Sequence, residues 1–167
     1  MKIFMVAALG AASFVSLPAL AQETTASFIG AQGDAAGSAA LMQSESGVLV
    51  RIEATGLPPE QWVALHIHEN GTCDPATGHE QAGGHFNPSG AEHGYLSASG
   101  PHAGDLPNIW VDAQGTARAQ VFSSLIALDD GETAVRGKAL MIHAQEDDYA
   151  SQPSGDAGDR IACAVIE

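Results

Sequence analysis

The sequence predicts an all-β domain, an eight-stranded antiparallel Greek-key sandwich or flattened barrel that carries two long functional loops. Helical periodicity is nearly absent, and 19 glycines and eight prolines interrupt the 167 residues throughout. Between these interruptions lie short segments with strand composition. We expect strands at residues 25–31, 36–43, 48–54, 61–69, 108–111, 117–122, 138–144 and 160–166.

The segment 48–54 is the clearest of these strands, because its apolar and charged side chains alternate. Val48, Val50 and Ile52 share one parity, and Arg51 has the other. Successive side chains of a strand point to opposite faces of the sheet, so this pattern indicates one buried and one exposed face.

Two connections between the expected strands are unusually long, residues 70–107 and 144–159. Loops beyond about 12–15 residues are usually either functional or disordered. The first connection holds four histidines, which favours function over disorder.

The first 21 residues have the pattern of an export signal. Lys2 precedes an apolar run at residues 3–17, and Ala19-Leu20-Ala21 is a small-residue cleavage motif. We therefore expect residues 1–21 to be a cleaved signal peptide. Residues 22–167 would form one domain, exported to a periplasmic or extracellular compartment and free of the membrane after cleavage. The alternative is an N-terminal membrane anchor, for which the apolar run is short.

The charge of the chain limits its partners. Removal of the signal leaves five Lys and Arg against 20 Asp and Glu, a formal charge of −15. Nucleic-acid binding needs a basic footprint, so this composition argues against nucleic acid, and against anionic membrane surfaces as well. The sequence allows a homodimer.

Cys73 and Cys163 are the two cysteines of the chain. An exported protein meets an oxidising compartment, in which an even pair usually closes. The bridge would close a loop of about 90 residues, which the chain-entropy model values at about 4–5 kcal/mol. The alternative is two free buried thiols, which the export signal disfavours.

Histidines occur on two expected strands with a parity that separates them from the core. Leu65 and Ile67 are expected to face inward, so His66 and His68 stand side by side on the opposite face, within reach of one metal ion. The same parity turns His143 away from the core. Such a site needs a cover, and the two long loops can supply it.

A second ligand pattern lies in the first long loop. It consists of three histidines and an aspartate, separated by seven, eight and two residues: His85, His93, His102 and Asp105. Three imidazoles and one carboxylate form a closed tetrahedral set suited to Zn²⁺, whereas the imidazole cluster on the strands suits copper among other metals. The alternative is a loop that is rich in histidine by chance. His79 matches no ligand position, and we expect it to be exposed to solvent.

Six short segments carry these residues: HIHENGTC at 66–73, GHFNP at 84–88, EHG at 92–94, PHAGDL at 101–106, MIH at 141–143 and GDAGDRIAC at 155–163. Their order and the ligand spacing resemble the copper–zinc superoxide dismutase family. The resemblance covers essentially the whole chain after the signal.

The resemblance implies dismutation of superoxide to O₂ and H₂O₂ by an enzyme with one copper and one zinc per subunit. Copper would be held by His66, His68, His85 and His143, and zinc by His85, His93, His102 and Asp105. His85 would be shared, since its two ring nitrogens are distinct donors.

The resemblance also implies roles for residues outside the two ligand sets. Arg160 would act beside copper on the anionic substrate, and His85 would take part in catalysis. Cys73 and Cys163 match the family's disulfide. Asp147, or Asp148 if the match slips by one residue, would link a copper histidine to a zinc histidine.

Other functions fit part of the pattern. An exported copper or zinc buffer without turnover would need the imidazoles but not Arg160. A zinc hydrolase would need an open zinc position, and a copper-delivery relative would be expected to lack copper ligands. Neither long loop contains Lys or Arg before Arg160. We therefore expect capture of superoxide to be slower or less dependent on salt than in family members with basic channels.

Overall fold

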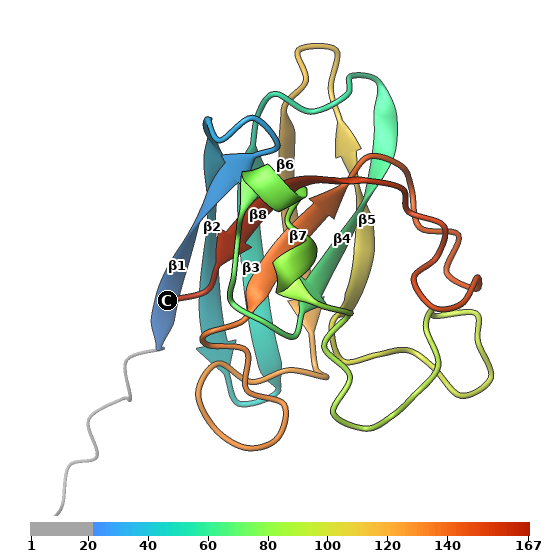
Figure 1. The fold of residues 1–167 in the computed structure, drawn as a ribbon. Coiled ribbons are helices and arrows are strands. Elements are labelled where there is room, and N and C mark those ends of the chain that lie inside the picture. The colour runs from blue at the N-terminus through green and yellow to red at the C-terminus, as the bar shows by residue number, and fades with distance from the viewer. Residues whose placement is uncertain (1–21) are drawn as a thin grey trace, which may run out of the picture.

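Eight strands close into a barrel in the computed structural model, which describes residues 22–167 (Figure 1). The strands are β1 (Glu23–Gly30), β2 (Ala35–Ser44), β3 (Gly47–Ala54), β4 (Gln61–His68), β5 (Asp105–Val111), β6 (Ala117–Ser123), β7 (Ala139–His143) and β8 (Arg160–Val165). Their order around the barrel is β1-β2-β3-β6-β5-β4-β7-β8, and all neighbours are antiparallel. The predicted fold class is confirmed, and the barrel is closed.

The connectivity is of the Greek-key type, because β4, β5 and β6 are neighbours in chain order while β7 returns to lie beside β4. In this register Leu65 of β4 pairs with Ile142 of β7. The return therefore brings His143, the last residue of β7, next to the strand that carries His66 and His68.

The main difference from the expected strands is at β5, which begins at Asp105, three residues earlier than predicted. Asp105 pairs with His66 of β4, and the register shifts between Val63 and Leu65. The pairing extends the strand into what the sequence shows as loop, so a candidate ligand starts a strand.

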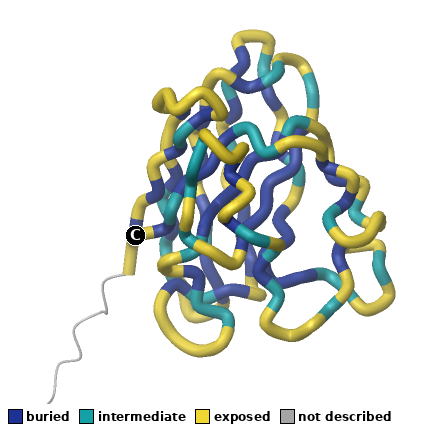
Figure 2. Tube along the Cα trace, in the orientation of Figure 1, coloured by how far each residue is buried: buried dark blue, intermediate teal, exposed yellow. Residues whose placement is uncertain are grey.

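The core follows the predicted alternation. Val48, Val50 and Ile52 are buried, whereas Arg51 and Glu53 are exposed. Buried residues of all eight strands form one core inside the barrel, while Ala139 and Met141 of β7 and Cys163 of β8 form a second, smaller cluster with Ala82. The exposed residues concentrate on the outer faces and loops (Figure 2).

The strand β4 departs from this alternation, since its residues from Val63 to His68 are buried on both faces. The outer face is covered by the two long connections. The first contains two short 3-10 turns, η1 (Pro75–Thr77) and η2 (Glu80–Ala82). The cover that the sequence required for the histidines is therefore present.

The predicted signal peptide, residues 1–21, lies outside the described residues. Within residues 22–167, no helix is long and apolar enough to cross a membrane.

Candidate metal centre

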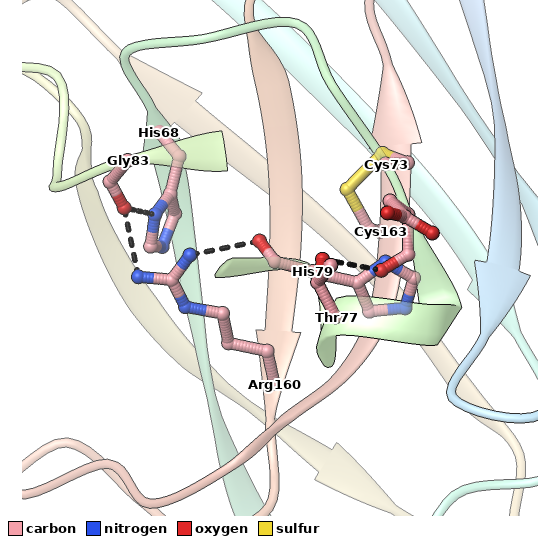
Figure 3. Close-up of a disulfide and its surroundings, with 8 residues drawn as sticks. His68, Cys73, Thr77, His79, Gly83, Arg160 and Cys163 are labelled. Atoms are coloured by element: carbon pink, nitrogen blue, oxygen red, sulfur yellow. Dashed lines mark hydrogen bonds between the residues drawn. A yellow bond between two sulfur atoms is a disulfide. The ribbon is translucent and has the colours of Figure 1, made fainter. Parts of the chain in front are cut away.

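A disulfide fastens the first long connection to the barrel. Cys73 and Cys163 are bridged, with Cα atoms 5.5 Å apart across a sequence separation of 90 residues (Figure 3). Cys163 lies in the middle of β8 and is fully buried. The bridge therefore holds the start of the loop against the outer face of β8.

The same loop then runs along the end of β4. The amide of Phe86 donates to the carbonyl of Ile67 at 2.8 Å, and Gly104 donates to the carbonyl of Phe86 at 2.8 Å. A Cβ on Gly104 would stand 2.3 Å from the Ile67 oxygen, so only glycine permits this approach. These bonds bring His85 beside His68, with which it forms an isolated bridge.

One carboxylate oxygen collects three imidazole nitrogens. Oδ1 of Asp105 lies 2.9 Å from His85 Nδ1, 3.1 Å from His93 Nδ1 and 3.2 Å from His102 Nδ1. Donor atoms of a tetrahedral zinc with bonds of about 2.0–2.1 Å lie about 3.3 Å apart. The distances from Asp105 are therefore close to those of a tetrahedral ligand set.

The other oxygen of this carboxylate is fixed by the backbone. Asp105 Oδ2 accepts hydrogen bonds from the amides of Gly94 at 2.9 Å and His102 at 3.0 Å. Both carboxylate oxygens are thus positioned, one by the loop and the other among the imidazoles.

A second cluster lies on the other side of His85. The donor atoms of four buried histidines fall within 4.8 Å of one another: His66, His68, His85 and His143. His66 also approaches the set of His85, His93 and Asp105. Its Nε2 is occupied by a carboxylate of the second long loop, which leaves its Nδ1 for the four-histidine cluster.

Hydrogen bonds on the outer edges of these rings fix their tautomers. His68 Nδ1 lies 2.9 Å from the carbonyl of Gly83, and His143 Nδ1 lies 3.2 Å from the carbonyl of Gly158. A carbonyl only accepts, so each Nδ1 carries the proton and each Nε2 presents a lone pair. The two Nε2 atoms are 3.3 Å apart, an arrangement that a cation between them would stabilise.

Two ring nitrogens that face the clusters are buried without a hydrogen-bond partner: His66 Nδ1 and His85 Nε2. A buried polar atom left unpaired costs about 1–3 kcal/mol. Metal ions at the two clusters would give each of these atoms a partner. The residues therefore fit two metal ions that share His85.

Burial keeps three rings of the four-histidine cluster neutral. It lowers the pKa of His66 to about 4, that of His143 to about 3 and that of His68 to about 2. Metal ligands must be deprotonated, so these histidines are in the ligand form at neutral pH.

In the cluster around Asp105, carboxylates raise the pKa of a histidine instead of leaving it lowered by burial. Burial opposes a charge on His93, but its hydrogen bonds with Asp105 and Asp147 raise the pKa of His93 to about 9. Burial also opposes ionisation of the two acids, yet hydrogen bonds from histidines hold the pKa of each carboxyl well below its usual range. The two ionised carboxylates thus favour positive charge at His93.

Asp147 joins the two clusters through its two carboxylate oxygens. Oδ2 lies 2.8 Å from His66 Nε2, and Oδ1 lies 3.0 Å from His93 Nε2. Asp147 is buried, whereas Asp148 is exposed and binds the backbone and side chain of Ser151. The structure therefore places Asp147, the first of the two candidates, in the bridging position.

Arg160 lies at the edge of the four-histidine cluster. Its Nη1 donates to the carbonyl of His79 at 2.9 Å, and its Nη2 donates to the carbonyl of Gly83 at 2.7 Å (Figure 3). These bonds use two of the five guanidinium N–H groups. The others are available to an anion that arrives at the cluster.

Comparison with known proteins agrees with this geometry. A family model described as copper/zinc superoxide dismutase (SODC) matches residues 35–166. The chain belongs to the copper/zinc superoxide dismutase family. The match spans all of the barrel except β1 and includes every residue of the two clusters.

Several relatives in the copper/zinc superoxide dismutase family cover most of the chain. Superoxide dismutase [Cu-Zn] 2 of Aquifex aeolicus is 48% identical over 145 residues, 84% of each chain. The Caulobacter vibrioides superoxide dismutase [Cu-Zn] is 38% identical, over 81% of this chain and 80% of its own. Among solved structures, a SOD-like protein from Bacillus subtilis has a TM-score of 0.80 at 34% identity, covering 86% of this chain and 97% of its own.

The structure corrects one expectation about this dismutase-family chain. His79 was expected to be exposed, but it is fully buried. Its amide donates to the carbonyl of Asp74 at 2.8 Å, which folds the loop into the two 3-10 turns that flank it. The disulfide fastens this loop to the barrel, and the His79 ring is buried there.

Sequence reasoning also missed the support of Asp147. Asn108 of β5 bonds the backbone of Asp147 twice, at 2.9 Å in each case, and the Tyr149 hydroxyl accepts from the amide of Asn108 at 2.8 Å. These contacts arise because the second long loop folds back on β5. No local feature of the sequence indicates that contact.

Proposed function

We propose that the protein is a superoxide dismutase that converts two superoxide ions and two protons to O₂ and H₂O₂. The proposed ligands are His66, His68, His85 and His143 for copper, and His85, His93, His102 and Asp105 for zinc. The observation that carries the proposal is the pair of complete, buried donor sets that share His85, with Arg160 anchored at their edge.

Copper, when bound, supplies a one-electron redox couple, while zinc supplies a fixed positive charge without redox change. The role of the chain is to bind the substrate and place protons. Arg160 is pre-oriented by two carbonyls, so its remaining N–H groups bind a small anion without reorganisation. His85 Nε2 faces the copper ligands while Nδ1 faces Asp105. The Nε2 atom of His85 is therefore placed to hold one of the two protons that the peroxide product needs.

A metal buffer without turnover is the alternative function, and the relatives include a "superoxide dismutase-like protein" of Bacillus subtilis, 37% identical. A buffer has no use for a guanidinium fixed beside the histidines. The anchoring of Arg160 therefore favours the dismutase.

Superoxide removal by the copper- and zinc-loaded protein tests the proposal, with His66→Ala and Arg160→Ala as variants. We expect rapid removal by the wild type, loss of copper and activity in His66→Ala, and retained metal with slower removal in Arg160→Ala. Stoichiometric metal binding by the wild type without superoxide removal would establish the buffer instead.

We further propose that residues 1–21 are a cleaved signal and that the protein works in the periplasm or outside the cell. The disulfide supports this, since such bonds persist in oxidising compartments. Fractionation of the native host, with N-terminal sequencing of the mature protein, tests both points. A full-length chain in the cytoplasm would contradict them.

We also propose that the domain forms a homodimer. The supporting feature is the pair Trp62 and Trp110. Their ring centroids lie 5.4 Å apart in an edge-to-face arrangement, and both side chains are about half exposed. Sedimentation of the wild type and of Trp110→Ser measures this, and a monomeric wild type at high concentration would contradict it.

A further inference from the structure

Arg160 borders a surface hollow of about 350 Å³, and the other charged residues that line it are both acids, Glu80 and Asp159. Both are exposed. The guanidinium group that would attract an anion therefore shares this hollow with two groups that repel an anion.

The local structure fixes both acids near the guanidinium. Glu80 begins η2, the turn that leads to Gly83, whose carbonyl holds Arg160. Asp159 immediately precedes Arg160, and its carbonyl accepts from the amide of Ala144 at 2.8 Å. The two acids thus belong to the segments that position the guanidinium.

Neither acid neutralises Arg160 by direct contact. Among residues 22–167, the ion pairs within 4.0 Å do not include Arg160. The guanidinium therefore keeps its charge and its free donors, and the acids act on an approaching anion at a distance.

We propose that Glu80 and Asp159 form an acidic rim that selects singly charged anions over doubly charged ones at Arg160. The proposal rests on the proposed function, because superoxide carries one negative charge. Coulomb repulsion is proportional to the charge of the incoming ion, so the rim slows superoxide modestly and excludes divalent anions such as hydrogen phosphate more strongly.

The size of the effect follows from this proportionality. As an order of magnitude, any carboxylate that lies about 8–10 Å from an ion in water at low salt changes the occupancy of a singly charged ion about twofold and that of a doubly charged ion about fourfold. Removing both acids should then raise the occupancy of a singly charged ion about fourfold and that of a doubly charged ion about sixteenfold. The divalent factor is the square of the monovalent one, a relation that a change of shape at the site would not produce.

The test uses Glu80→Gln, Asp159→Asn and the double variant, with Glu132→Gln as matched control. Glu132 is also exposed but does not line the hollow, so the control removes the same charge from elsewhere. Melting curves of all variants check that the fold is intact.

The first readout needs no metal and no activity. Nitrate and inorganic phosphate at pH 8 are titrated into the metal-free protein at low salt while the NMR signal of the Arg160 side-chain N–H is followed. We expect the double variant to bind phosphate about sixteenfold and nitrate about fourfold more tightly than the wild type, with Glu132→Gln unchanged. The proposal would be overturned if the affinities for the two anions rose by the same factor, or if Glu132→Gln gave the same increases in affinity.

The second readout uses the copper- and zinc-loaded protein. We expect kcat/KM for superoxide to rise about fourfold in the double variant at low salt, together with stronger inhibition by phosphate. An active wild type whose kcat/KM and phosphate inhibition do not change in the double variant would contradict the rim. A wild type without dismutase activity, but with the NMR selectivity, would refute the proposed function and leave the rim standing.

Discussion

His68 and Arg160 donate to the same carbonyl oxygen, that of Gly83, at 2.9 Å and 2.7 Å. The backbone turn after η2 therefore orients a candidate copper ligand and the candidate anion-binding group together. Gly83 has φ +77, and a Cβ there would lie 2.5 Å from Glu69 Oε1. Glycine is required at this position by its conformation.

The shared carbonyl makes Arg160→Lys a demanding substitution. A lysine keeps the charge, but its single ammonium group cannot reproduce the fork that contacts two carbonyls. We expect kcat/KM for superoxide to fall about tenfold with unchanged copper and zinc content. Arg118→Lys is the control, since Arg118 is exposed and pairs with Glu53. Activity equal to the wild type in Arg160→Lys would show that charge alone suffices.

Asp147 and Asp148 form an internal comparison of adjacent acids. We expect Asp147→Asn to weaken metal affinity about 10–100-fold, because a neutral amide cannot orient His66 and His93 as the carboxylate does. Asp148→Asn removes the same charge from an exposed position. Competition with a chelator measures both, and equal losses in the two variants would contradict the bridging role.

The strands and the cluster on β4 could be predicted because their signal is local. The alternation at 48–54 and the parity of His66 and His68 depend on neighbouring residues alone, and the structure has both. Asp105 as the first residue of β5 was not predictable, since its pairing with His66 depends on a distant strand.

The environment of Arg160 shows why other contacts of the site could not be predicted from the sequence. The guanidinium is held by carbonyls of His79 and Gly83. Every residue has a backbone carbonyl, so the residue types at these two positions do not indicate that their carbonyls accept hydrogen bonds from Arg160. The burial of His79 likewise depends on how the disulfide loop folds against the barrel. The contacts that backbone atoms make in the site therefore could not be predicted from the sequence.

The close contact between Gly155 and Asp147 predicts a sensitive position in the second long loop. A Cβ on Gly155 would stand 1.9 Å from Asp147 Oδ1, and φ there is +73. Gly131 has φ +84 but open space around its Cβ position. Both Gly→Ala variants carry the strain of a positive φ, about 1 kcal/mol, whereas only Gly155→Ala also displaces the carboxylate.

We therefore expect Gly155→Ala to lose metal affinity about as strongly as Asp147→Asn, and Gly131→Ala to bind metal like the wild type. Chelator competition and melting of the metal-free proteins separate the two effects. Metal loss in Gly131→Ala of the same size would attribute the result to backbone strain alone.

The buried histidines predict how the metal-free protein responds to acid. The pKa values of His66, His68 and His143 are lowered from about 6.5 to about 4, 2 and 3. Between pH 6.5 and pH 4 the unfolded chain therefore binds protons that the folded chain does not, and the free energy of unfolding falls as the pH falls. Each such histidine contributes up to about 1.4 kcal/mol per pH unit in this window.

Burial also lowers the pKa values of His102 and His79, which therefore act in the same direction as the three histidines, whereas the remaining shifted groups near the clusters act outside this window. His93, with its pKa raised to about 9, is protonated in both states below pH 6.5, and the two carboxyls with lowered pKa values lose their contribution only below about pH 4. Urea unfolding of the metal-free protein at pH 5.0 and 6.5 measures the slope. We expect His68→Asn/His143→Asn to flatten it by about 2–3 kcal/mol per pH unit. A slope that is the same in the double variant and in the wild type would show that these rings are not the groups that resist protonation.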